Sequence, residues 1–344
     1  MKIVTKETIQ VAVLGVGFGI THVKALAEQP GTLRLKMVCD QNEERLESAK
    51  QVLGEKAAGI LFTKDYHDIL NDPDIDVVDL ALPHHLHQRF AEEFAAAGKH
   101  IMLDKPLART EEEGKAIIEA ARKNDVQLMV AFNFRFAPMY QAIQKRISDG
   151  VIGQVLLGLT RHNQRFFYPG GSNWRNSASI GGGAIIGSGV HNIDFMRFCL
   201  GDPAEVYACG VNDAKRLDAE AGAAVVFRYA NGTVVNFFCN WCKSSRNIDA
   251  SGVFGEWEFF GETGELRKVI DKGLCISRLD DSVEEVEYDK DATILTTFTN
   301  LWRHFEECLR TGKTPLTSGE EALKTQHLIA IVYESMKTGK PIRF

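Results

Sequence analysis

The sequence predicts an α/β protein of two domains: an N-terminal doubly wound parallel sheet, then an α+β domain whose sheet is mostly antiparallel. The chain has 344 residues, more than one ordinary hydrophobic core organises. Short apolar runs alternate with helical patterns over about the first 130 residues, which is typical of a parallel sheet covered on both faces. Strand-like segments joined by turns follow. We therefore expect domains at 1–131 and 132–344.

The strands of the first domain should be continuously apolar, because helices cover both faces of such a sheet. The expected strands are IQVAVL (9–14), LRLKMVC (33–39), IDVVDLALP (75–83), HIMLDKP (100–106) and VQLMVAFNF (126–134). The helical patterns between them cover 21–29, 41–56, 89–99 and 110–124.

The second domain should begin with a helix at 138–149 and continue mainly with strands. Strand patterns cover 155–163, 205–212, 222–241 and 255–270, and helices return at 293–310 and 319–338. Asn231 and Gly232 lie between two apolar alternations, and this dipeptide is a strong hairpin signal.

Composition and charge narrow the class of protein. Hydrophobic residues make up 44% and charged residues 25%, with a net charge of −6, so nothing attracts nucleic acid. The best membrane candidate, 75–83, is short and interrupted by Asp79, and the first ten residues lack the apolar core of a signal peptide. We therefore expect neither a membrane partner nor a secretory route.

The seven cysteines are scattered and odd in number, which favours a reduced, cytoplasmic protein over a disulfide framework. Cys239 and Cys242 form a CxxC within a strand pattern. Positions three apart on a strand face opposite sides, and no second CxxC completes a zinc site. Strand packing is the favoured interpretation, and no metal is expected.

The segment GVGFG (15–19) lies between a predicted strand and a predicted helix, as in dinucleotide-binding loops. Gly15 permits the tight turn, and Gly17 lets a pyrophosphate approach the helix N-terminus. Gly19 comes one place early, since the usual third glycine falls at Ile20. A plain strand-to-helix turn is the alternative interpretation.

Asp40 ends the second predicted strand, where the acidic residue of the dinucleotide fingerprint belongs. Its carboxylate can accept both ribose hydroxyls of NAD and would repel the 2′-phosphate of NADP. The alternative is an aspartate that caps the next helix. We favour ribose binding, and therefore NAD over NADP.

Three segments are candidates for the chemistry. Lys105 in DKP (104–106) ends a strand, where ligands bind in open parallel sheets, and Pro106 restricts its backbone to extended conformations. The histidines of PHHLH (83–87) favour a loop near the nicotinamide, with His87 packed or hydrogen-bonded, over a metal site. In GGGAIIGSGVHNID (181–194), a lone histidine follows three glycines, and such a histidine is a proton acceptor or a structural residue.

The succession of motifs resembles the Gfo/Idh/MocA oxidoreductase family, which includes inositol dehydrogenases and glucose–fructose oxidoreductase. The resemblance covers nearly the whole chain. Beyond the glycine loop, Asp40 and 181–194, it is carried by ALPHHLH (81–87), AAAGKHIMLDKPLA (95–108), FNFRF (132–136), NWR (173–175) and the tail 318–342.

The resemblance implies a Rossmann domain followed by a domain with a large open-faced sheet, a tightly held nicotinamide cofactor, and oxidation of a sugar or polyol hydroxyl. Lys105 matches the family's signature lysine, with Asp104 in place of Glu, and His191 matches its histidine; these two are the expected catalytic residues. The expected cofactor contacts are Gly15, Gly17, Phe18, Gly19, Ile20, Asp40, Leu82, Pro83, His84, His87, Asp104, Lys105, Pro106, Trp174 and Arg175. The expected substrate contacts are Lys105, Arg135, Trp174, Arg175, His191 and Asp194, with further specificity expected from the loop 161–180.

This chain departs from many relatives at Gly187, where they carry an aspartate one helical turn before the histidine. A neutral imidazole can take the proton by itself. We therefore expect NAD-dependent oxidation, or the reverse reduction, of a secondary alcohol of a sugar, sugar acid or cyclitol. The alternatives are an NAD-dependent glycoside-processing or epimerising enzyme, and a non-catalytic dinucleotide-binding regulator.

Assembly is also expected from the sequence. The strand segments 225–230 and 233–241 carry apolar residues on both faces, including Phe237, Phe238 and Trp241. One face should cover the domain's own helices and the other should meet a second subunit. We expect a homodimer or homotetramer through this sheet.

Overall fold

The computed structural model describes residues 3–28, 31–164, 174–212, 217–241, 256–269 and 273–344. The chain divides into two compact units. Unit 1 contains Met1–Asn133 and Ile294–Gln326, and unit 2 contains Phe134–Thr293 and His327–Phe344. Unit 1 thus includes residues 294–326, which a single boundary at 131/132 would assign to the second domain.

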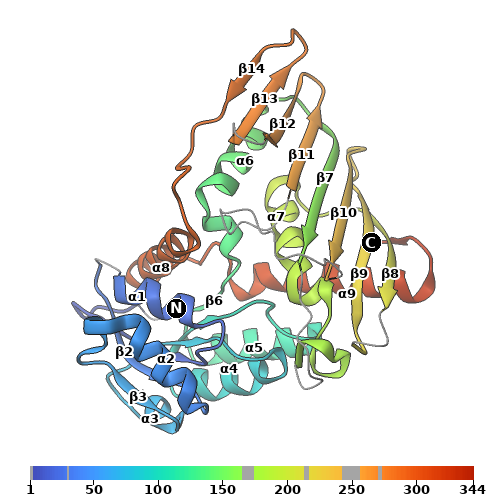
Figure 1. The fold of residues 1–344 in the computed structure, drawn as a ribbon. Coiled ribbons are helices and arrows are strands. Elements are labelled where there is room, and N and C mark those ends of the chain that lie inside the picture. Colours follow the sequence, from blue (N-terminus) through green and yellow to red (C-terminus); the bar gives the residue numbers. More distant parts are fainter. Residues whose placement is uncertain (1–2, 29–30, 165–173, 213–216, 242–255, 270–272) are drawn as a thin grey trace. The chain divides into compact units, whose positions relative to one another are not determined.

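Unit 1 contains a six-stranded parallel sheet in the order β3-β2-β1-β4-β5-β6, as predicted (Figure 1). Its strands are β1 (Ile9–Leu14), β2 (Leu33–Cys39), β3 (Leu61–Thr63), β4 (Val77–Leu80), β5 (His100–Leu103) and β6 (Leu128–Val130). The sequence did not reveal β3, because this three-residue edge strand is partly exposed and lacks an apolar run.

The helices of unit 1 follow the predicted patterns, with α3 and the two 3-10 turns as additions. They are α1 (Ile20–Glu28), α2 (Glu43–Leu53), η1 (Gly54–Ala57), α3 (His67–Leu70), η2 (His84–Leu86), α4 (His87–Ala96), α5 (Glu111–Lys123) and α8 (Ile294–Thr311). Helix α9 (Gly319–Thr338) starts in unit 1 and continues into unit 2. None of the described helices is long and apolar enough to cross a membrane.

Aromatic packing explains why α8 belongs to unit 1. His22 of α1 lies edge-on against Phe298 and Trp302 of α8, with ring centroids 4.5 and 6.0 Å apart. The segment after α8 also joins the sheet, since the amide of Val130 donates to the carbonyl of Thr317. The apolar face of α8 is therefore buried against the Rossmann helices.

Unit 2 contains a nine-stranded sheet in the order β14-β13-β12-β11-β7-β10-β9-β8-β15 (Figure 1). Every pairing is antiparallel except β7 with β10, which is parallel and was not predicted. The strands are β7 (Val155–Asn163), β8 (Glu205–Asn212), β9 (Glu220–Arg228), β10 (Val234–Asn240), β11 (Glu256–Gly261), β12 (Gly264–Val269), β13 (Gly273–Arg278), β14 (Val283–Glu285) and β15 (Ile342–Arg343). The expected Asn-Gly hairpin joins β9 to β10, with Gly232 at a φ of 92°.

Helices α6 (Pro138–Ser148) and α7 (Val190–Leu200) pack on one face of this sheet. Tyr140 of α6 and Phe195 of α7 contact Trp257 of β11 edge-on, at 6.0 and 4.7 Å between ring centroids. The opposite face carries Phe238, which is 52% exposed, while its neighbour Phe237 is fully buried. Two-residue periodicity therefore separates a core face from an open apolar face, as the sequence predicted.

Candidate active site

The glycine loop lies at the carboxyl end of β1, where the strand order of unit 1 reverses between β1 and β4. Such a switch point is where open parallel sheets bind nucleotides. Gly15 has a φ of 97°, and a side chain there would overlap the carbonyl of Ala81. A side chain at Gly19 would overlap the carbonyl of Gly15. Gly19, and not residue 20, thus allows the close approach of helix and strand.

The middle of the loop is open. A Cβ atom at Gly17 would meet only the guanidinium of Arg45, at 3.7 Å. Phe18 is 48% exposed, and Ile20 begins α1. Free backbone amides at this helix N-terminus suit a pyrophosphate.

Asp40 follows β2 and is 7% exposed. Its Oδ2 accepts a hydrogen bond from the Val16 amide at 2.8 Å, and its Oδ1 accepts one from the Asn42 amide at 2.9 Å. The cap of α2 is Asn42, whose side chain accepts from the Arg45 amide. The capping interpretation of Asp40 is therefore wrong, and its carboxylate is tied to the glycine loop.

Sequence reasoning did not single out Arg45, which lies beside Asp40. Its Nη1 lies 3.5 Å from Oδ2 of Asp40, and its side chain is 57% exposed. A signal existed, because residue 45 lies in the first turn of the helix that follows Asp40, where a side chain can reach back. An arginine near this acidic residue is the type of group that accommodates a 2′-phosphate in dinucleotide-binding folds.

His87 braces two loops at the carboxyl ends of β4 and β5. It is fully buried, with Nδ1 3.0 Å from the carbonyl oxygen of Pro106 and Nε2 2.9 Å from that of Leu82. Burial lowers the pKa of His87, so the ring is neutral and donates to one of these carbonyls. His84, also buried, packs edge-on against it at 5.6 Å between ring centroids. Pro83 precedes that turn.

Lys105 is the second residue after β5 and is half-buried. Its amide donates to Oδ1 of Asp104 at 2.8 Å, and the amide of Asp104 donates to the carbonyl of Leu80 at 3.0 Å. The Lys105–Pro106 peptide bond is cis, a geometry that the sequence did not reveal. The strand and its first turn therefore fix the lysine backbone at the switch-point edge of the sheet.

In unit 2, the segment that follows the glycines 181–183 forms one helical run, a π-helix (Ile185–Gly189) that passes into α7 at Val190. His191 is half-buried, and its ring stacks on Phe134 at 4.7 Å between centroids and 22° between planes. Phe134 stacks in turn on Tyr140. The imidazole is thus held by aromatic contacts that no local pattern predicts.

Arg135 and Asp194 form a bidentate ion pair, with Nε–Oδ2 and Nη2–Oδ1 both at 2.8 Å. Their side chains are 2% and 1% exposed. The resemblance implied substrate contacts for both, but paired and buried groups of this kind favour support of α7.

Trp174 and Arg175 form a 3-10 turn in which the guanidinium lies 4.5 Å from the indole ring centre. The carbonyl of Arg175 accepts from the Gly183 amide at 3.1 Å, so this turn is fastened to the start of the His191 helix. Part of the expected specificity loop, residues 165–173, lies outside the described residues, as does Cys242 of the CxxC.

The ring of Trp241 contacts the helix at Gly187, the position at which the sequence departs from the family pattern. A Cβ at Gly187 would lie 2.8 Å from Cζ2 of Trp241. The indole Nε1 donates to the hydroxyl of Ser188, which donates to Gln164, both at 2.8 Å. An indole and its hydrogen bonds thus leave no room for a longer side chain at 187 unless Trp241 moves.

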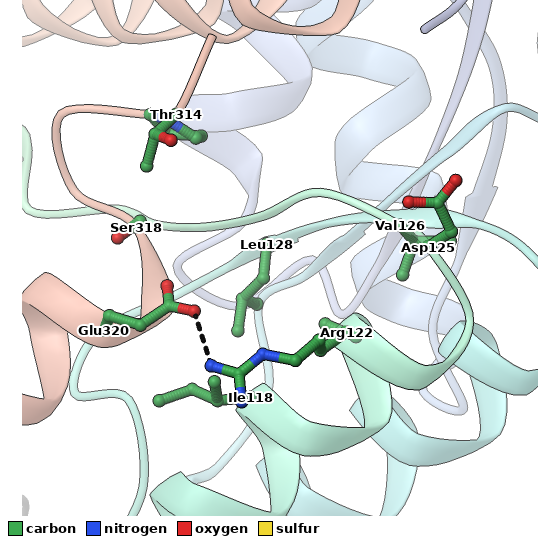
Figure 2. A pocket seen from close by; sticks show the side chains of 10 residues that line it. Ile118, Arg122, Asp125, Val126, Leu128, Thr314, Ser318 and Glu320 are labelled. Carbon is green, nitrogen blue, oxygen red and sulfur yellow. Dashed lines mark hydrogen bonds and ion pairs between the residues drawn. The ribbon is translucent and has the colours of Figure 1, made fainter. Parts of the chain in front are cut away.

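A cavity of about 430 Å³ lies within unit 1 at the amino end of β6. Figure 2 shows Arg122 reaching toward Glu320, with the apolar side chains of Ile118 and Leu128 nearby. Ligands bind at the opposite, carboxyl edge of such sheets, and none of the predicted site residues lines the cavity. Among the described residues, no group of His, Cys, Asp or Glu could hold a metal ion.

Comparisons with known proteins agree with this geometry. Residues 9–132 match the model of the GFO/IDH/MocA oxidoreductase family, NAD-binding Rossmann fold, and residues 140–267 match the GFO/IDH/MocA C-terminal domain. The levoglucosan dehydrogenase of Pseudarthrobacter phenanthrenivorans is 35% identical over 294 residues, which cover 76% of this chain and 73% of that protein. The NAD-dependent scyllo-inositol 2-dehydrogenase of Bacillus subtilis is 26% identical over 98% of this chain and 97% of that protein.

A solved structure supports the same fold over the full length. Levoglucosan dehydrogenase in complex with NADH and levoglucosan matches with a TM-score of 0.85 at 25% identity, covering 98% of this chain and 99% of that chain. The predictions of the fold class, the family and an NAD cofactor are therefore confirmed. The chain belongs to the Gfo/Idh/MocA family of NAD-dependent oxidoreductases, dehydrogenases that act on sugar and polyol alcohols.

Proposed function

We propose that this protein oxidises a secondary ring hydroxyl of a pyranose-type sugar, with an anhydro sugar or a glucoside as the first candidates. The observation that carries this proposal is the 35% identity to a levoglucosan dehydrogenase. A "D-glucoside 3-dehydrogenase" of Escherichia coli, 31% identical over 201 residues, supports the same substrate class.

The residues of unit 1 fit NAD. Gly17 leaves the helix N-terminus open, and Asp40 presents a carboxylate oriented by two backbone amides. When bound, NAD supplies the hydride acceptor. Asp40 would accept the ribose hydroxyls, and Phe18, Leu82, Pro83 and His84 come from the loops that flank the switch point.

The proton chemistry is assigned to His191 and Lys105. His191 takes the hydroxyl proton as a neutral imidazole. Lys105 donates a hydrogen bond to the same oxygen, and its positive charge stabilises the developing alkoxide. Trp174 and Arg175 are proposed to contact the rest of the sugar.

The test measures NADH formation with levoglucosan, methyl glucosides, D-apiose and scyllo-inositol. We expect His191→Ala to lower turnover by about 10²- to 10⁴-fold, the usual scale for loss of a general base, with little change in NAD affinity. Lys105→Met should abolish turnover and weaken cofactor binding. Near-native turnover in His191→Ala would overturn the assignment of the base.

The alternatives predict different outcomes in the same assay. A glycoside-processing or epimerising enzyme would convert substrate without net NADH formation. A regulator would bind NAD and reduce none of it with any sugar.

We also propose a cytoplasmic homodimer or homotetramer that pairs through the open face of the unit 2 sheet, without nucleic-acid partners. The exposed apolar side chains on these strands support the assembly: Leu157, Tyr207, Val226 and Phe238 are 37% to 52% exposed. Several exposed apolar side chains on one face of a sheet are typical of an interface. The odd, scattered cysteines support a reducing compartment.

A further inference from the structure

The helical run that carries His191 begins with an unusual cap. The first amides of a helix lack intrahelical partners, and a side chain at the N-cap position usually accepts from one of them. Here the glycines 181–183 precede the helix and have no side chain. The amide of Ile185 instead donates to Oε1 of Glu220 at 2.7 Å. Glu220 is the first residue of β9 and is 6% exposed.

Gly183 is the residue that admits this carboxylate. It has a φ of 126°, and a Cβ placed there would overlap Oε2 of Glu220. The third glycine of the motif therefore leaves the space in which a carboxylate from another strand caps the helix.

Glu220 also binds a third element, helix α9. The hydroxyl of Tyr333, on the unit 2 part of α9, donates to Oε1 of Glu220 at 3.1 Å. Asp218, two residues earlier, accepts from the amide of Ala178 at 2.7 Å. Two acidic residues at the start of β9 thus hold the 3-10 turns before the glycines and the helix after them.

The capped amide of Ile185 and the imidazole of His191 lie on the same helical run. The run from Ile185 to His191 is continuous helix. It packs closely on β10, since a Cβ at Gly189 would lie 3.0 Å from Cζ of Phe237. A shift at the first turn is therefore transmitted along the run, because side chains behind it allow no local adjustment.

We infer that Glu220 is a positioning residue for the proposed base, and that its carboxyl oxygen sets where the helix presents His191. This inference rests on the proposed function. Glu220 needs only an acceptor oxygen for this role. Glu220→Gln keeps that oxygen for Ile185 and Tyr333, whereas Glu220→Ala removes it.

The test is a double-mutant cycle on the sugar that gives NADH. We expect Glu220→Ala to lower kcat by about 10- to 100-fold, the scale of a misplaced catalytic group, with NAD affinity unchanged. Glu220→Gln should recover kcat to within about threefold of the parent protein. In the His191→Ala background, Glu220→Ala should lower turnover by less than about twofold, because residues that act as one unit are not additive.

Glu205→Ala is the matched control. Glu205 is a carboxylate on β8 of unit 2 that pairs with Arg343 of the edge strand β15, and its loss should leave kcat unchanged. If Glu220→Ala does not fold, Glu220→Asp replaces it, since the shortened carboxylate withdraws from Ile185 and should lower kcat in the same His191-dependent way.

The outcomes distinguish a failure of the inference about Glu220 from a failure of the proposed function. Parental kcat in a folded Glu220→Ala or Glu220→Asp protein overturns the inference while the loss in His191→Ala still supports the function. An equal loss in the His191→Ala background also overturns it, because Glu220 would then act elsewhere. Near-native turnover in His191→Ala removes the proposed base and the inference with it.

Discussion

At the residue scale, several buried polar groups of unit 2 are paired with groups from other elements. Oδ1 of Asn192 accepts from Nδ1 of His162 at 2.8 Å, and its Nδ2 donates to Oγ1 of Thr160 at 2.7 Å. Arg135, from the 3-10 turn before α6, pairs with Asp194 of α7, the helix that also carries Asn192. Each group costs little while its partner is present and much when the partner is removed.

Removing one member of the Arg135–Asp194 pair should therefore destabilise the fold. We expect Asp194→Ala to lower the free energy of unfolding by about 3–5 kcal/mol, because it leaves a buried guanidinium without its counter-ion. Urea denaturation measures this loss. Asp149→Ala, which breaks the exposed Lys145–Asp149 pair, is the control and should cost less than about 1 kcal/mol. A fully stable Asp194→Ala protein with a raised KM for sugar would instead assign Asp194 to the substrate.

At the element scale, the ends of strands and the starts of helices carry the site. The turn after β1 and the end of β2 meet through Asp40, and Arg45 of α2 lies beside them. The end of β5 presents Lys105, and β9 caps the run into α7 through Glu220. Each of these is a junction between elements, where backbone groups are available for ligands or caps.

Asp40 and Arg45 should have opposite effects on the preference for NADH over NADPH. Asp40 repels the 2′-phosphate of NADPH, a repulsion of a few kcal/mol in a partly desolvated site. We expect Asp40→Ala to reduce the preference for NADH by about tenfold or more. Arg45→Ala should sharpen the preference, because it removes the positive charge beside the ribose position. Titration calorimetry with both cofactors measures these affinities, and tighter binding of NADPH than NADH by the unchanged protein would contradict the assignment of Asp40.

Burial makes Glu220 a source of pH-dependent stability. Desolvation raises its pKa from 4.5 to about 7, and its hydrogen bonds with Ile185 and Tyr333 oppose this rise. The raised pKa means that the folded state binds the proton more tightly than the unfolded chain. Glu220 therefore contributes most stability below about pH 4.5, and this contribution is lost as the pH rises toward 7.

Glu220→Gln removes the titrating carboxyl group, so that no charge is buried at this position at any pH. The Tm difference between Glu220→Gln and the parent protein should thus increase between pH 5 and pH 8, by the equivalent of up to about 3 kcal/mol. Nearby Cys239 does not titrate in this range, since burial raises the pKa of its thiol far above 9. A Tm difference that stays constant with pH would show that the carboxyl of Glu220 has an ordinary pKa.

At the scale of the whole molecule, each unit is organised around its own sheet. The parallel sheet of unit 1 is covered by helices, whereas the sheet of unit 2 carries α6 and α7 on one face and exposes apolar side chains on the other. An antiparallel sheet can be solvated on one side, and several of the exposed side chains on this face, such as Val226 and Phe238, are apolar.

A charged side chain introduced on the open face of the unit 2 sheet should therefore dissociate the proposed assembly into monomers. Phe238 lies on this face, opposite Ala224 of β9 and Arg161 of β7. We expect Phe238→Lys to shift the protein to monomers at micromolar concentration, because each copy would bury an ammonium group beside the like-charged Arg161. Light scattering measures the mass, and Val283→Lys, on the short edge strand β14, is the control. A parent protein that is already monomeric would refute the assembly.

Much of this protein could be predicted from local pattern alone. The alternation of strands and helices, the Asn231-Gly232 hairpin and the alternating faces of β10 each follow from periodicity or turn chemistry within a few residues. The GVGFG loop and Asp40 were recognisable because their spacing along the chain reflects one strand–turn–helix unit. Lys105 and His191 were candidates from their segments, a strand end and a glycine-rich helix start, and the family resemblance then gave them catalytic roles.

Only the tertiary structure decided which groups meet. Asn42 caps α2, so Asp40 is available to bind the glycine loop, and Gly19 allows the close packing of helix and strand. Arg135 pairs with Asp194, and Glu220 caps the helical run of His191. It also placed residues 294–326 with unit 1 and paired β7 in parallel with β10. These features depend on contacts between residues far apart in the chain. Local periodicity carries the conformation of each segment, whereas its partners are selected by packing and by the need of every buried polar group for a hydrogen bond.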